Sequence, residues 1–199
     1  MDITVAIPTH NAAQTMRVCL DKLQVQRIPD LKVLVYDNGS RDGTFGMMSE
    51  LMANKYYAIK PALDKYSLDI TFFQGKHDDK ISPYQNGWLT KKLLGKLITT
   101  KYIFFLDPDV LIPPNAIPMM IEEFEKHPDA GFMGIQYEPD AKHVMFGSTI
   151  WKTEVFNKIG EWDGVAGGCD CNFAKIEVEK MGLKSTHHPT LLAYHYKYF

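Results

Sequence analysis

Unbroken apolar runs alternate with amphipathic stretches along the first half of the chain. β-Branched and aromatic runs predict strands at 3–7, 31–36, 68–73 and 102–106. Apolar residues recur at helical spacing between them and predict helices over about 12–25, 44–59 and 86–98. Strands that alternate with helices in this way favour an α/β sandwich with a mainly parallel sheet.

The pattern is more mixed after this point. We expect a helix from Pro113 to about 127, two strands at 131–137 and 143–146, and a short helix at 153–159. A loop rich in glycine follows at 160–168, then a helix at 170–181 that Gly182 ends, and one short strand in 190–199. No linker separates the two halves, so residues 1–199 are predicted to form a single domain.

The run Tyr102–Leu106 is apolar throughout and stops at two carboxylates, Asp107 and Asp109. Pro108 cannot continue a central ladder, so the strand must end there and deliver both acids to the carboxyl edge of the sheet, where open α/β folds bind ligands. Two close negative charges are costly unless a cation or hydrogen-bond donors compensate, and a hard divalent ion bound to phosphate would do so. The alternative is a simple Asp-Pro-Asp turn.

Composition narrows the class of protein. The chain has 199 residues, 45% hydrophobic and 23% charged, with a net charge of -2, so no basic field points to a nucleic-acid partner. Three cysteines are too few for a disulfide framework and favour a reducing compartment. The N-terminus lacks a signal-peptide pattern, and no apolar stretch approaches the roughly 20 residues of a membrane span. These features predict a cytoplasmic protein without a membrane span.

The second strand also runs into an acid, Asp37, and then into the turn-forming segment 38–44. A strand that meets a Gly/Ser turn before a helix places a helix N-terminus where an anion can bind. The same residues could form no more than a tight turn. The segment is not a calcium loop, because Gly39 and Arg41 occupy positions that should hold ligands.

Taken together, three segments resemble the N-terminal motifs of the family-2 glycosyltransferases of GT-A fold. They are Val5–Asn11, Asp37–Thr44 and Phe105–Asp109. Further on, Val155–Asp163, Gly168–Phe173 and His195 resemble the acceptor-side segments of that family. The resemblance covers nearly the whole chain in the right order. It implies a GT-A-like, three-layer α/β/α sandwich in one Rossmann-like domain, with a nucleotide-sugar half (1–110) and an acceptor half (111–199).

The resemblance also implies an activity, which is the transfer of a sugar from a nucleotide-diphosphate sugar to an acceptor hydroxyl with inversion. A divalent ion, Mn²⁺ or Mg²⁺, would assist, a UDP-sugar is the first expectation for the donor, and the acceptor would be a glycan or glycoconjugate. An alternative is a nucleotide-binding module that has lost transfer and acts as a binding or assembly partner. A nucleotidyltransferase would need a Gly-rich, basic phosphate loop after the first strand, and Pro8–Asn11 is neither.

Residue roles carry over from the same resemblance. The metal would be held by Asp107, Asp109 and His195. The catalytic base would be Asp170, where the usual Glu-Asp pair reads Cys169-Asp170. On the acceptor side, Trp162 would stack on a sugar and Asp163 would bind hydroxyls. The donor-binding residues would be Pro8, Thr9, Asn11, Asp37, Gly39 and Asp107.

Several of these residues have simpler explanations, which the sequence leaves open. Asp170 could be a helix N-cap, Trp162 a core residue, and His195 a satisfied histidine in a strand. Cys169 and Cys171, together with His187 and His188, could bind structural zinc, although Cys-x-Cys is not the usual spacing. The family also places a basic residue before the two acids, and the sequence does not decide which lysine fills this role. The candidates are Lys76, Lys80, Lys91 and Lys92.

Overall fold

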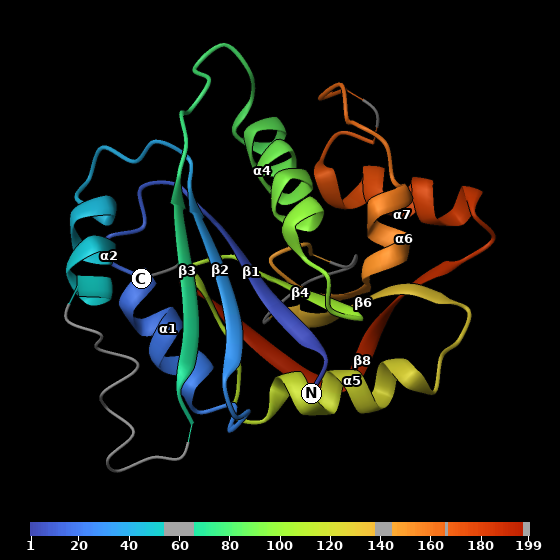
Figure 1. Cartoon of the computed structure of the whole chain (residues 1–199). Coiled ribbons are helices and arrows are strands. Elements are labelled where there is room, and N and C mark those ends of the chain that lie inside the picture. The colour runs from blue at the N-terminus through green and yellow to red at the C-terminus, as the bar shows by residue number, and fades with distance from the viewer. Residues whose placement is uncertain (54–65, 138–144, 166, 197–199) are drawn as a thin grey trace.

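The computed structural model describes residues 1–53, 66–137, 145–165 and 167–196 (Figure 1). Its centre is a sheet in the order β3-β2-β1-β4-β7-β6-β8-β5. The strands are β1 (Ile3–Thr9), β2 (Leu31–Asp37), β3 (Leu68–Gln74), β4 (Tyr102–Leu106), β5 (Val110–Leu111), β6 (Ala130–Tyr137), β7 (Ser148–Lys152) and β8 (Lys184–His195).

The sheet is parallel in its first half and mixed in its second. β3, β2, β1 and β4 run parallel to one another, whereas β7 is antiparallel to both β4 and β6. β6 and β8 are parallel, and β5 pairs with β8 in the antiparallel sense. The carboxyl ends of β1, β2 and β4 therefore meet at one edge, as the sequence predicts for the acids at 37 and 107.

Helices cover both faces of this sheet and enclose two apolar cores. One core packs α1 (Met16–Gln24), α2 (Thr44–Ala53) and α5 (Ala116–Glu125) on the sheet. The other packs α4 (Pro83–Leu97), α6 (Thr153–Lys158) and α7 (Asp170–Lys180) on the opposite face (Figure 1). The predicted three-layer sandwich is confirmed.

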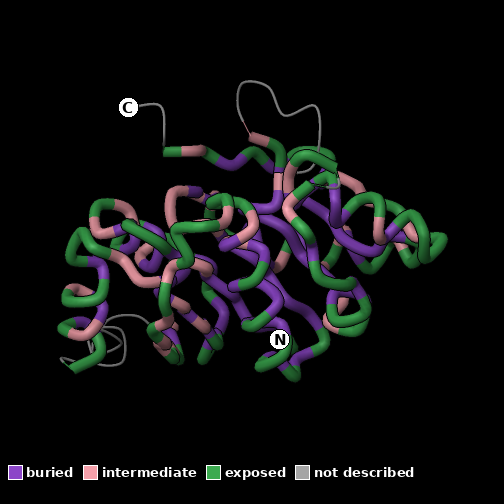
Figure 2. The backbone as a smooth tube through the Cα atoms, turned by 90° about the horizontal axis from the view of Figure 1, so that it is seen from above, coloured by how far each residue is buried: buried purple, intermediate pink, exposed green. Residues whose placement is uncertain are grey.

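β4 contributes to both cores because successive side chains point to opposite faces. Phe104 belongs to the first core and Phe105 to the second, and neither ring is exposed. Burying each ring contributes about 1.5–3 kcal/mol relative to leaving it in water. The strand that carries the acid pair is thus held by packing on both sides, and Figure 2 shows the buried tube running through the middle of the molecule.

Three predicted helices begin at other residues than expected, and α5 is one of them, since it begins at Ala116 rather than 113. α1 begins at Met16 rather than 12, because Ala12 donates its backbone N–H to Thr44 Oγ1 (2.8 Å) and Ala13 donates to Asp42 Oδ2 (3.0 Å) instead of entering a helix. α4 begins at Pro83 rather than 86. Ser82 is its N-cap, with Oγ accepting from Gln85 N (3.1 Å), and proline suits the first helical position.

The prediction of a strand at 143–146 is wrong for the two of these residues that the structure describes. Residues 143 and 144 lie outside the described residues, and Met145 and Phe146 precede the strand, which begins at Ser148. The polar residues of β7 concealed it, although one of them, Thr149, is buried and its Oγ1 accepts from Trp151 Nε1 (2.9 Å).

The last strand, β8, is longer than the short one predicted within 190–199 and spans twelve residues. Its polar start and Pro189 concealed the pattern. An irregular register against β6 accommodates that region, with a shift between Gly134 and Gln136.

Candidate functional site

A cleft of about 1120 Å³ opens at the carboxyl edge of the parallel strands. The end of β1, the acid pair after β4, helix α4, the start of α7 and the end of β8 all contribute to its walls. Predicted site residues that line it are Pro8, Thr9, Asn11, Asp107, Asp109, Asp170 and His195. The fold therefore brings together seven of the predicted residues from four separate parts of the chain.

The acid pair forms the predicted turn, and the turn is anchored on both sides. Val110 N donates to Asp107 O (3.1 Å), and Asp107 N donates to Gly147 O (2.8 Å) at the start of β7. On the other side Tyr196 N donates to Asp109 O (2.7 Å). His195 Nε2 lies 3.4 Å from Asp109 Oδ2. A turn and a cation site are thus compatible in this segment, because both carboxylates still face the cleft.

Lys91 is the basic residue that the sequence did not single out. It lies on α4 with its side chain 5% exposed, and its Nζ is 2.8 Å from Asp170 Oδ2 and 3.9 Å from Asp107 Oδ1. Burial opposes its charge, but the carboxylates of Asp170 and Asp107 outweigh that cost and raise the pKa of Lys91. One buried cation therefore connects the acid pair to the predicted base.

The other lysines of this region lie elsewhere. Lys92, the next residue on α4, donates to the carbonyls of Ile159 (2.6 Å) and Phe156 (3.2 Å). Lys76 and Lys80 are exposed, and among the described residues neither belongs to the cleft lining.

The Asp107 carboxyl lies in a crowded environment. A Cβ on Gly147 would lie 2.5 Å from Asp107 Oδ2 and 2.7 Å from Tyr137 Oη, so only glycine fits there. Tyr137 in turn stacks on His195, with ring centroids 5.7 Å apart. Burial raises the pKa of Asp107, Lys91 opposes this, and the negative charges of Asp109 and Asp170 add to it. A bound cation would relieve this repulsion.

Asp170 is the first residue of α7, and the helix N-cap is Cys169, whose Sγ accepts from Asn172 N (3.4 Å). The alternative of Asp170 as N-cap is therefore wrong. Asp170 Oδ1 accepts from Cys171 N (2.9 Å), and Oδ2 accepts from Lys91. The carboxylate is held at the cleft wall from two directions.

Asp37 lies at the predicted edge but is fully buried behind the cleft wall. Its Oδ1 accepts from Ser40 N (3.0 Å) and from the Ser40 hydroxyl, whereas Oδ2 has no hydrogen-bond partner within the described part of the chain. Gly39 has a φ of 68°, and a Cβ there would lie 2.7 Å from His77 N. The segment thus forms the tight turn that the sequence analysis gave as an alternative. Within the described residues, Asp37 Oδ2 remains without a hydrogen-bond partner.

Asn11 joins the loops after β1 and β2. Its N–H donates to Ser40 Oγ (2.8 Å), and its Oδ1 accepts from Arg41 N (2.8 Å). Beside it, the rings of His10 and His77 stack with centroids 4.1 Å apart, and both line the cleft. The sequence analysis missed this pair and Tyr137, because nothing in the pattern indicates that these three loops and strands meet.

The acceptor-side residues after α6 lie outside the described cleft lining. Trp162 is 3% exposed and packs on Phe173. It is therefore a core residue, which was the alternative to a sugar-stacking role. Asp163 is exposed, and its Oδ1 accepts from Val165 N (2.9 Å).

Of the four residues considered for a structural zinc site, only the two cysteines lie in one group. Cys169 and Cys171 are grouped with Asp170, and no histidine belongs to that group among the described residues. His188 uses Nδ1 to accept from Leu191 N (3.1 Å) within β8.

Comparison with known proteins assigns this arrangement to a family. The family model described as "Glycosyl transferase family 2" matches residues 4–62 and 96–174, which together exceed half of the chain. The chain belongs to glycosyl transferase family 2. A search of curated proteins found no match.

Solved structures agree on the GT-A fold of this family-2 chain. A mannosyltransferase from Pyrobaculum calidifontis in complex with GDP-Man and Mn²⁺ has a TM-score of 0.75 at 18% identity over 97% of this chain. TarS 1-349 from S. aureus in complex with UDP-GlcNAc has a TM-score of 0.65 at 16% identity over 98%. A putative glucose-1-phosphate thymidylyltransferase from Bacillus anthracis reaches 0.62 at 10% identity over 96%.

The family-2 chain spans 56% of the mannosyltransferase and 58% of TarS 1-349, so it corresponds to little more than half of each. Within its described residues, no helix is long and apolar enough to cross a bilayer.

Proposed function

We propose that the cleft transfers a sugar from a nucleoside-diphosphate sugar to a hydroxyl of a glycan or glycoconjugate, with inversion and with the help of Mn²⁺ or Mg²⁺. The observation that carries this proposal is the contact of Lys91 with both Asp170 and Asp107. A donor half and an acceptor half of a transfer site are thereby connected within one cleft.

The metal would be held by Asp107, Asp109 and His195. Two carboxylates and one imidazole suit Mn²⁺, and Mg²⁺ commonly uses one or two carboxylates together with substrate phosphates. The crowding of Asp107 and Asp109 against one another and the 3.4 Å approach of His195 to Asp109 support this ligand set. When bound, the ion would stabilise the charge that develops on the leaving diphosphate.

The donor would lie along the walls formed by Pro8, Thr9 and Asn11, with the nucleoside toward the Asp37–Gly39 turn. Asp37 has one carboxylate oxygen without a hydrogen-bond partner among the described residues, and such a buried oxygen is energetically costly. This supports a hydrogen bond to Asp37 from an N–H or O–H group of the nucleoside. UDP is the first nucleotide to test. Solved structures of two structural neighbours are complexes with GDP-Man and with UDP-GlcNAc, respectively.

Asp170 would take the proton of the acceptor hydroxyl, which is otherwise a poor nucleophile. In the free protein Lys91 Nζ pairs with this carboxylate at 2.8 Å. A diphosphate beside Asp107 would compete for Lys91 and leave Asp170 available to the acceptor. Because the base acts from the acceptor side, opposite the leaving group, direct displacement would invert the anomeric centre. Trp162 and Asp163 would have to act from the periphery of the acceptor half.

Calorimetry of UDP, GDP and dTDP with and without Mn²⁺ tests the proposal. We expect binding of one diphosphate that depends on Mn²⁺ and is lost in Asp109→Ala. Absence of diphosphate binding under all these conditions, or binding that Asp109→Ala leaves unchanged, would contradict it. Diphosphate binding without any sugar release or transfer would favour the alternative of a non-catalytic binding module.

A further inference from the structure

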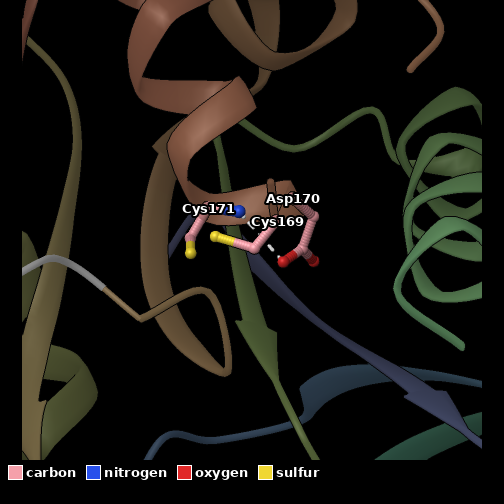
Figure 3. A group of neighbouring side chains, drawn as sticks. All are labelled: Cys169, Asp170 and Cys171. Atoms are coloured by element: carbon pink, nitrogen blue, oxygen red, sulfur yellow. Dashed lines mark hydrogen bonds between the residues drawn. The ribbon is translucent and has the colours of Figure 1, made fainter. Parts of the chain in front are cut away.

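Two sulfurs flank the proposed base at the start of α7. One ligand atom from each of Cys169, Asp170 and Cys171 can be chosen so that all three lie within 4.8 Å of one another. Figure 3 shows the two sulfurs beside one another, with the Asp170 carboxylate on the same turn. All three residues line the cleft. The group is therefore open to solutes that enter the cleft.

The chemistry of this group differs from that of the acid pair. Two sulfurs and one carboxylate oxygen match the ligands of Zn²⁺ and related thiophilic ions, whereas Mg²⁺ and Mn²⁺ prefer oxygen. Zn–S bonds of about 2.3 Å in a tetrahedral site place neighbouring ligands roughly 3.8 Å apart. The observed separations are at most 4.8 Å, so the ligand atoms would have to approach one another by up to about 1 Å.

Cys169 is the N-cap of α7, and its Sγ accepts a hydrogen bond from Asn172 N (3.4 Å). Burial and the hydrogen bond with Cys169 raise the pKa of the Cys171 thiol to about 12. An ion that binds must therefore displace thiol protons into solvent, as metals do at other cysteine sites.

We propose that Cys169, Asp170 and Cys171 form a site for a thiophilic divalent cation of the Zn²⁺ class, distinct from the site of the hard ion at Asp107 and Asp109. An ion bound there takes the carboxylate that Lys91 now contacts and blocks proton transfer from the acceptor. The site is thus inhibitory. The inhibition rests on the proposed function, whereas binding of the ion does not.

Binding is tested by titrating the full chain with Cd²⁺ in excess Mg²⁺ and following the ultraviolet sulfur-to-cadmium charge-transfer band. We expect the band to saturate at one equivalent. Cys169→Ser and Cys171→Ser should each weaken affinity by at least about tenfold, the lower end of what the loss of an outer-sphere partner costs at known metal sites. Cys19→Ala is the matched control, because Cys19 is buried in the other core and should leave the band unchanged.

Inhibition is tested separately with Zn²⁺ in a transfer assay at saturating Mg²⁺. Zn²⁺ should inhibit the wild type reversibly. The rate of the Cys169→Ser/Cys171→Ser variant should be the same with Zn²⁺ as without it. Serine is a good N-cap, so the helix start is preserved, and a thermal melt checks this. Absence of the Cd²⁺ band in the wild type, or its persistence in the double variant, would overturn the site. A band with equal Zn²⁺ inhibition in both proteins would overturn its inhibitory role.

Discussion

Lys91 Nζ lies 2.8 Å from Asp170 Oδ2, although the two residues are 79 positions apart and belong to different helices. Their side chains are 5% and 11% exposed, so the ion pair is shielded from solvent. It joins α4 to the start of α7 across the cleft.

Removing the charge of Lys91 should destabilise the fold. Lys91→Met keeps the length of the side chain but leaves Asp170 without its cation, and breaking a buried pair costs about 3–5 kcal/mol. Urea unfolding should show this loss in the free energy of unfolding. The double variant Lys91→Met/Asp170→Asn should recover part of it, because no unpaired charge remains. A double variant that is as unstable as the sum of both single variants would contradict the pairing.

Gly147→Ala should abolish binding of the metal and the diphosphate. The added Cβ would lie 2.5 Å from Asp107 Oδ2, so the carboxylate must move away from its position in the cleft. Calorimetry with UDP and Mn²⁺ measures this loss. Gly46→Ala is the control, since a Cβ there meets nothing within 4 Å. It should bind normally and be more stable by about 0.5–1 kcal/mol, because Gly46 lies inside α2.

His188 should make the protein sensitive to acid. Burial lowers the pKa of His188 below its usual 6.5. The unfolded chain therefore binds a proton at higher pH than the folded chain, and stability is lost as the pH falls below about 6.5. His188→Asn retains an acceptor for Leu191 N but cannot be protonated in this range. Its unfolding free energy should fall less steeply with acidification, and an unchanged slope would count against this role.

The sequence was sufficient to predict that Asp107 and Asp109 lie at the edge of the sheet, because the apolar pattern that predicts the strand also fixes its end. The run 102–106 is apolar throughout, so it had to be a buried strand, and the acids that follow it had to reach the sheet edge. The order of helices and strands likewise predicted the three layers.

The sequence could not show that Lys91, rather than Lys92, faces the cleft, because the residue at which α4 begins was not known. Neighbouring residues on a helix point about 100° apart, and the predicted start at 86 did not fix which of them faces the cleft. The cap at Ser82 and the packing of Trp88 fix that orientation. β7 and β8 escaped prediction for a different reason, because Ser148, Thr149 and His188 are polar residues that are nevertheless buried in these strands.

The central claim is that one cleft binds the donor and deprotonates the acceptor with different residues. It is tested most directly by measuring UDP binding and sugar transfer in parallel for Asp170→Asn. We predict that transfer falls by about 10²–10⁴, the usual contribution of a general base, while Mn²⁺-dependent UDP binding is retained. Transfer at the wild-type rate in a folded Asp170→Asn variant would contradict the account.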